Sequence, residues 1–171
     1  MSDLLVTNGI AHDSASRANL EITYAHAAVH RDIIVGFGVR SSGNTEILFR
    51  APADPVEIRL LWSVVSAGAV DINFIENPTV TDDGTAVDIY RLNRKSVKAT
   101  QALVFLDPTF SGGDTLLEAQ AGAGGFLGGS DGSVALHQDA EFILKPSTDY
   151  IIQVLGSSDV TFAGEWYEVG V

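Results

Sequence analysis

Short stretches in which apolar and polar residues alternate follow one another along most of the chain. Residues 69–76 are the clearest case, because Val70, Ile72 and Phe74 alternate with polar side chains. A period of two is that of a β-strand with one buried face. Stretches that alternate in this way, or that are rich in β-branched residues, predict strands at 20–24, 32–39, 45–50, 56–65, 69–76, 85–90, 102–106, 115–119, 141–144, 150–155 and 160–167.

Turn-forming residues separate these stretches. The signals are Asn77-Pro78, Asp83-Gly84, Asp107-Pro108, Gly112-Gly113, Lys145-Pro146 and the polar run 156–159. No long segment has a helical period, and only residues 92–101 could form a short helix, although they fit a basic loop equally well. About ten short antiparallel strands with frequent turns predict an all-β fold, a single-domain β-sandwich. A jelly-roll-like arrangement is preferred over an immunoglobulin-like one, because the strands are many and their connections long.

The length of 171 residues is that of one domain, and it is enough to bury a core without disulfides or metals. Residues 1–19 are polar and weakly patterned, which predicts a flexible N-terminal arm before a sandwich domain at 20–171. The arm could stay loosely docked. Alternatively, it could reach a neighbouring subunit through its apolar residues, which are Leu4, Leu5, Val6 and Ile10.

A glycine-rich stretch, 121–133, holds two large apolar residues, Phe126 and Leu127. Glycine carries the largest backbone entropy cost on ordering, so such a loop is not stiff by itself. The two side chains could dock beneath the loop on their own subunit or on a partner. They are therefore candidate interface residues, together with those of the arm.

Two stretches of the chain echo one another at an offset of 30 residues. Residues 77–88 and 107–118 both begin with Asn or Asp, then Pro-Thr, and both reopen a strand after a Gly/Asp turn. The favoured interpretation is two similar loops at the same end of a sandwich, since a solenoid would need at least three copies.

Charge narrows the range of partners. The chain has 10 basic and 22 acidic residues, which gives a formal net charge of -12. Phosphate backbones and anionic membrane surfaces would repel it, so neither nucleic acid nor a membrane is expected as a partner. The absence of cysteine excludes a thiol nucleophile and every Cys-ligated zinc site. No signal peptide or membrane-spanning apolar run is recognised.

The sequence offers little for catalysis or for a cofactor. His26 and His30 lie four residues apart, but that spacing favours a metal only on a helix, and this segment is predicted as strand or loop. His137, Asp139 and Ser133 are the residue types of a hydrolytic triad without a nucleophile elbow around the serine. The expectation is a protein that is not an enzyme and that holds no cofactor or metal.

Aromatic residues raise a carbohydrate-binding alternative. Trp62, Trp166, Tyr150 and Tyr167 could form the exposed platform of a lectin-like sandwich. However, Trp62 lies in the most apolar predicted strand, and the last strand should turn at least one ring inward. Core aromatics are therefore the favoured interpretation.

Several of the turn and strand motifs together resemble a known family. Taken as a set, they are similar to tailed-bacteriophage virion proteins described as capsid decoration or cement proteins. The resemblance covers roughly residues 70–170. The matching segments are Glu76-Asn-Pro-Thr-Val-Thr-Asp-Asp-Gly-Thr85, Tyr90-Arg-Leu-Asn-Arg94, Phe105-Leu-Asp-Pro-Thr109, Gly113-Asp-Thr-Leu-Leu117 with the glycine-rich stretch after it, 141–152 and Glu165-Trp-Tyr-Glu168.

This resemblance implies a jelly-roll-like sandwich that forms a homotrimer on the outer face of a phage head. The partner would be the major capsid protein, and assembly would take place in the host cytoplasm. No catalytic residue carries over. The expected function is that of a non-enzymatic virion structural protein that binds the capsid surface and stabilises it. The alternative is a carbohydrate-binding or receptor-binding module of a phage tail fibre or baseplate.

Overall fold

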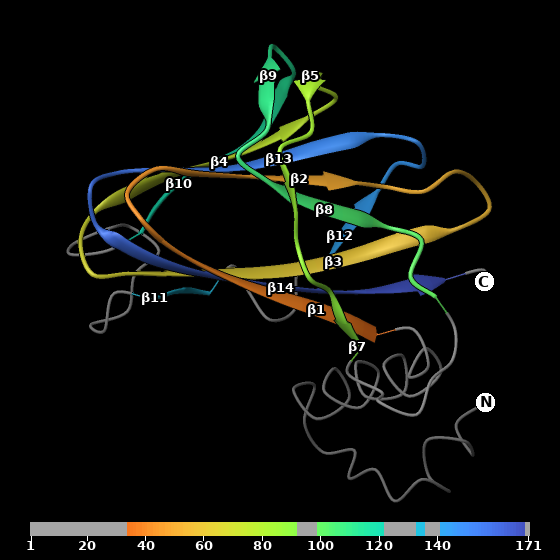
Figure 1. Cartoon of the computed structure of the whole chain (residues 1–171), viewed down its shortest axis with the longest axis horizontal. Coiled ribbons are helices and arrows are strands. Elements are labelled where there is room, and N and C mark those ends of the chain that lie inside the picture. Colours follow the sequence, from red (N-terminus) through yellow and green to blue (C-terminus); the bar gives the residue numbers. More distant parts are fainter. Residues whose placement is uncertain (1–33, 92–98, 122–132, 136–140, 170–171) are drawn as a thin grey trace, which may run out of the picture.

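The computed structural model describes residues 34–91, 99–121, 133–135 and 141–169. These residues contain no helix, and their regular structure consists of antiparallel strands, so the prediction of an all-β fold is confirmed. Two six-stranded sheets pack face to face, and a separate two-stranded ribbon rises above one of them (Figure 1). Nowhere in this part of the chain is there a helix long and apolar enough to cross a bilayer.

One sheet, here called sheet A, is built on three long strands. β3 (Glu57–Ser66), β14 (Asp159–Val169) and β1 (Ile34–Ser42) lie side by side in that order. Three short strands complete its edges, namely β11 (Ser133–Ala135) and β12 (Phe142–Leu144) beside β3, and β7 (Tyr90–Arg91) beside β1.

The second sheet, here called sheet B, lies above sheet A in Figure 1. Its strands run in the order β10 (Asp114–Ala121), β4 (Val70–Glu76), β13 (Asp149–Leu155), β2 (Thr45–Arg50), β8 (Leu103–Leu106) and β6 (Thr85–Ala86). The ribbon consists of β5 (Thr79–Asp82) and β9 (Thr109–Ser111), which pair only with each other among the described strands.

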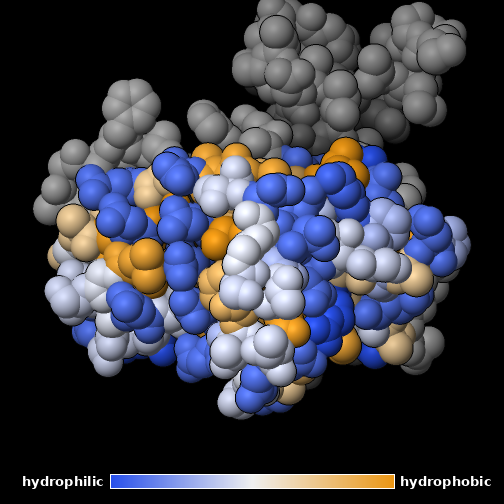
Figure 2. Space-filling model, turned by 90° about the horizontal axis from the view of Figure 1, so that it is seen from above, coloured by the Kyte–Doolittle hydropathy of each residue, from blue (hydrophilic) through white to orange (hydrophobic). Residues whose placement is uncertain are grey.

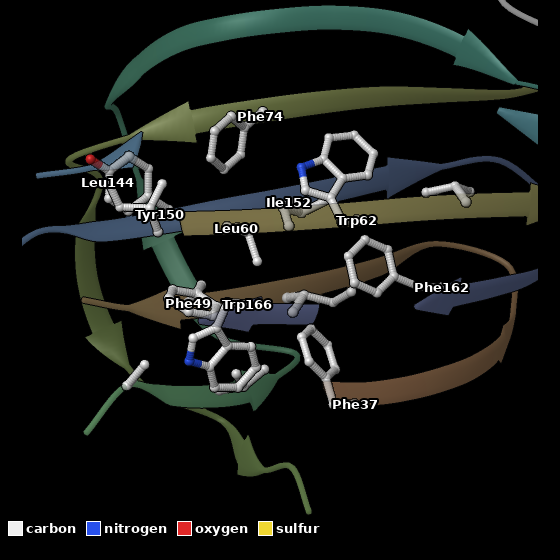
Figure 3. Close-up of a cluster of buried hydrophobic side chains, with 14 of the residues drawn as sticks. Phe37, Phe49, Leu60, Trp62, Phe74, Leu144, Tyr150, Ile152, Phe162 and Trp166 are labelled. Carbon is white, nitrogen blue, oxygen red and sulfur yellow. The ribbon is translucent and has the colours of Figure 1, made fainter. Parts of the chain in front are cut away.

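The core lies between the facing sides of the two sheets and is rich in aromatic rings (Figure 3). The ring of Trp166 meets Phe49 edge-on at 5.0 Å, and Trp62 stacks with Phe162 at 5.9 Å. Phe74 stacks with Tyr150 at 5.5 Å. Such pairs add stability beyond the area they bury. The contact of Trp166 with Phe49 joins sheet A to sheet B, whereas the other two pairs each lie within one sheet. Trp62, Trp166 and Tyr150 are all buried.

The predicted strands agree with the structure where the alternation is strong, as at 69–76, which contains β4, and the strand predicted at 45–50 is β2. The single strand predicted at 85–90 is wrong. The chain forms β6 in sheet B and then β7 in sheet A, because it crosses from one sheet to the other. Val87 and Ile89 pack against the core during this crossing, and their apolar character explains the error. The strand predicted at 20–24 lies outside the described residues.

Three strands were not predicted, and residues 92–101 can be assessed only in part. β5, β9 and β11 are short, with three or four residues each. Of the segment 92–101, residues 92–98 lie outside the described residues, and 99–101 have no regular structure.

Candidate interaction surfaces

The ribbon is fixed to sheet B by an arginine that joins two strands and a turn. Arg50, at the end of β2, donates from Nε and Nη2 to Asp149 of β13 at 2.8 and 3.0 Å. Its Nη1 and Nη2 donate to Asp83, in the turn after β5, at 2.8 and 2.9 Å. These hydrogen bonds hold the pKa of the Asp83 carboxyl below its usual range. The same guanidinium lies 5.6 Å from the ring centre of Phe105, a cation–π contact.

Beneath the ribbon lies a small second core on the outer side of sheet B. Leu48, Ile75 and Ile151 point away from the main core, and both Leu48 and Ile151 are fully buried. They are covered by Val80 and Phe110 of the ribbon and by Phe105. The apolar contacts and the Arg50 bridge therefore both hold the ribbon on sheet B, so the ribbon is a docked element of the fold.

The sequence echo corresponds to the two strands of this ribbon. Asn77 and Asp107 adopt left-handed φ values of 55° and 54°, and each is followed by a buried proline. Each pair redirects the chain out of sheet B, and the two departing segments then pair antiparallel as β5 and β9. Asn and Asp tolerate this conformation better than most residues, which explains their place in both copies.

The ribbon and the sheet beside it expose polar groups. Side chains of the ribbon that face solvent include Thr79, Thr81, Asp82, Thr109 and Ser111. On the adjoining outer face of sheet B, Gln153 donates to Glu46 at 2.8 Å and Asn73 donates to Gln153 at 3.1 Å. Figure 2, seen from the ribbon side, shows a mainly hydrophilic surface with smaller hydrophobic areas.

The outer face of sheet A has a different character. Its strands present small side chains there, including the exposed Gly38 and Ala163. At its borders lie three large apolar residues that are about half exposed, namely Val65 at 47%, Tyr90 at 56% and Ile143 at 59%. Two charged residues, Arg40 and Glu165, are exposed on the same face.

Several polar side chains at the ends of the strands form hydrogen-bonded networks, although the buried Nε1 of Trp62 has no hydrogen-bond partner among the described residues. Tyr150 donates to Glu76 at 3.1 Å and accepts from the amide of Lys145 at 2.8 Å, while Nζ of Lys145 lies 2.5 Å from Glu76. Burial, with the hydrogen bond to Glu76, raises the pKa of Tyr150 to about 12. A phenol that holds its proton so firmly is poorly suited to act as a base. A second network joins Tyr167 to Glu141, which also accepts from Arg59.

Glu168 carries a fully buried carboxylate at the end of β14. It accepts hydrogen bonds from the hydroxyl of Thr100 at 2.6 Å, from the amides of Gln101 and Ala102 at 2.9 and 3.1 Å, and from the indole of Trp166 at 3.3 Å. Such a set of donors compensates for the burial of the charge. The carboxylate therefore fixes the segment that leads into β8, and it is used inside the fold.

The candidate interface residues Leu4, Leu5, Val6, Ile10, Phe126 and Leu127 lie outside the described residues, as do the predicted arm and all four histidines. Trp62, Trp166, Tyr150 and Tyr167 are all buried, so these four do not form an exposed platform for a sugar. In the described part of the chain, no group of three or more His, Cys, Asp or Glu side chains is placed to hold a metal ion.

Neither a scan of the sequence against protein-family models nor a search of curated proteins finds a match. The ribbon and its Arg50 bridge were not foreseen in the sequence. The only signals were the echo and the turn residues, and these do not say which segments pair.

Proposed function

We propose that this chain is a non-enzymatic structural protein of a virus particle, a decoration protein that binds the outer surface of a phage head. The observation that carries the proposal is the docked ribbon. The Asn77-Pro78 and Asp107-Pro108 motifs, which belong to the resemblance, build a projection from sheet B. Because Arg50 and the small second core fix it, the projection loses little conformational entropy when it meets another protein.

The strand order supports a jelly-roll arrangement. In sheet A the order β1, β14, β3, β11 is matched in sheet B by β2, β13, β4, β10. The first strand thus pairs with the last strand, and the second with the last but one. Nested pairing of this kind is expected when a long hairpin folds over into two sheets. Such sandwiches form rigid building blocks, which suits a shell component.

The chemistry of the described residues is also compatible with a binding role. The charged and phenolic groups in the interior pair with one another, as in the Arg50, Tyr150 and Glu168 networks. A decoration protein needs no reactive group. It needs a surface that binds the assembled shell and not the free subunits, because such binding stabilises the assembled state by mass action.

Cosedimentation of the full chain with purified, undecorated heads tests the proposal. Saturable binding at a fixed ratio to the major capsid protein is expected. The mass of the purified chain in solution tests the homotrimer that the resemblance implies. An arginine in place of an exposed ribbon residue, Thr79→Arg, should weaken binding about tenfold or more, as is usual for a charge forced into an interface. Ser157→Arg, on the exposed turn between β13 and β14, is the matched control.

Absence of wild-type binding to heads would refute the decoration function. Equal binding by both arginine variants would show that the ribbon does not contact the capsid. The predicted arm then becomes the candidate. Deletion of residues 1–19 should abolish binding and leave the unfolding transition of the sandwich unchanged if Leu4, Leu5, Val6 and Ile10 anchor the protein.

A further inference from the structure

The register of sheet A places nine outward side chains in three rows across β1, β14 and β3. The residues between them along each strand, such as Phe37, Phe162 and Trp62, are buried in the core, which fixes these nine on the outer face. The first row is Gly36, Glu165 and Leu61; the middle row is Gly38, Ala163 and Ser63; the third row is Arg40, Thr161 and Val65.

The middle row consists only of small side chains. Gly38 and Ala163 are exposed, and none of the described segments covers them. A flat row of small residues allows a second sheet to approach closely. The rows on either side carry the larger and charged groups, and the distribution of these groups indicates what could lie against the face.

Arg40 and Glu165 have no ion-pair partner among the described residues. In contrast, Arg50, Arg59 and Lys145 all form ion pairs within the chain. Arg40 lies in the third row and Glu165 in the first. Four residues separate these rows, or about 13 Å at roughly 3.3 Å per residue, so the two side chains do not pair with each other on one face.

We infer that this face binds a second copy of the chain about a two-fold axis that runs along the middle row. Such an axis places the third row of one copy on the first row of the other. Arg40 then lies over Gly36 of the partner subunit and beside the partner's Glu165. Val65 meets the partner's Leu61, and Ala163 meets the partner's Ala163.

The self-complementary pattern is the reason for choosing a second copy as the occupant. Each unpaired charge finds its opposite, and a half-exposed apolar residue meets an apolar one. A two-fold axis parallel to the strands would instead place Glu165 near the partner's Glu165, which like charge disfavours. These nine residues are fewer than the roughly 20–30 per side of a stable interface, so the association is weak and depends on concentration. The inference does not depend on binding to a capsid.

Analytical ultracentrifugation of the full chain over a range of concentrations, up to about 1 mM, tests this association. A reversible doubling of mass is expected, from the monomer or from any trimer formed through another surface. Ala163→Arg places two arginines against each other on the axis. It should raise the dissociation constant for the doubling at least about 30-fold, as for an uncompensated charge in an interface. Ser157→Arg should leave the dissociation constant unchanged.

A charge swap keeps the test decisive if Ala163→Arg disturbs the fold. Arg40→Glu and Glu165→Arg should each weaken the doubling about tenfold, and the double variant should return to within about threefold of wild type. Recovery in the double variant is specific to the proposed contact. The inference would be overturned if the wild-type chain shows no doubling of mass. It would also be overturned if Ala163→Arg leaves the doubling unchanged, or if the double variant dimerises no better than the single variants.

Discussion

The two outer faces of the sandwich use the same alternating strands in opposite ways. On sheet B, three outward residues are large and apolar, and the chain covers them with its own ribbon. On sheet A, the outward residues of the central row are small, and two of them, Gly38 and Ala163, are exposed. This difference indicates that an outward apolar residue stabilises the fold only where another segment covers it. Where the described residues leave sheet A uncovered, the centre of the face carries little apolar bulk, and the half-exposed Val65, Tyr90 and Ile143 lie around it.

Truncation of a residue beneath the ribbon should produce the largest difference in stability between the two faces. Ile151→Ala removes a fully buried side chain from the small second core and should lower the free energy of unfolding by about 2–5 kcal/mol. Thr161→Ala, at an exposed outward position of sheet A, should change it by less than about 0.5 kcal/mol. Urea unfolding at low protein concentration measures both. Similar losses would contradict the conclusion that the ribbon covers and packs against Ile151.

The two turns that lead out of the ribbon strands β5 and β9 are expected to differ less in their effect on stability. Gly84 has a φ of 82°, and a Cβ there would lie 2.0 Å from the carbonyl oxygen of Leu106. Gly112 has a φ of 63° and open space around it.

Gly84→Ala should therefore cost about 2–4 kcal/mol, since backbone strain and a clash add together. Gly112→Ala, its matched control, should cost only about 1–2 kcal/mol, for strain alone. Thermal unfolding followed by circular dichroism compares the two variants. A loss for Gly112→Ala as large as that for Gly84→Ala would mean that the close approach of Leu106 does not fix the ribbon.

Local sequence patterns predicted the strands whose apolar side chains are buried in the core or beneath the ribbon. The alternation in 69–76 gave β4 to within one residue, because each apolar position faces the core or the ribbon. The ribbon strands were missed because Thr79–Asp82 and Thr109–Ser111 are short and mostly polar, and they are held by turns and long-range contacts. The echo was visible in the sequence, but the pairing of its two copies was not.

The candidate surfaces could not be predicted from the sequence because they depend on register. Nothing local places Arg50 beside both Asp83 and Asp149, which are 33 and 99 residues away. The same holds for the rows of sheet A, where Gly36 and Glu165 become neighbours only through the pairing of β1 with β14. Alternation gives the face on which a residue lies, and long-range pairing gives its neighbours.

The smallest expected effect concerns how acid acts on the two faces. Arg50 lowers the pKa of Asp83 in the folded protein, so the unfolded chain takes up the proton more readily. The stability from this pair is present above the ordinary aspartate pKa of about 3.9, and it is lost as the pH falls through the lower folded value. Glu165, on sheet A, has no ion-pair partner among the described residues and provides the matched control.

Asp83→Asn should therefore lower the urea midpoint at pH 7 and reduce the further drop between about pH 5 and pH 2, because the variant has less to lose on acidification. Glu165→Gln should leave both the midpoint and the acid-dependent drop close to those of wild type. The measurement is a series of urea titrations across this pH range at low protein concentration. If Asp83→Asn keeps the full acid-dependent drop, the Arg50 bridge does not stabilise the ribbon, and the small second core alone must hold it on sheet B.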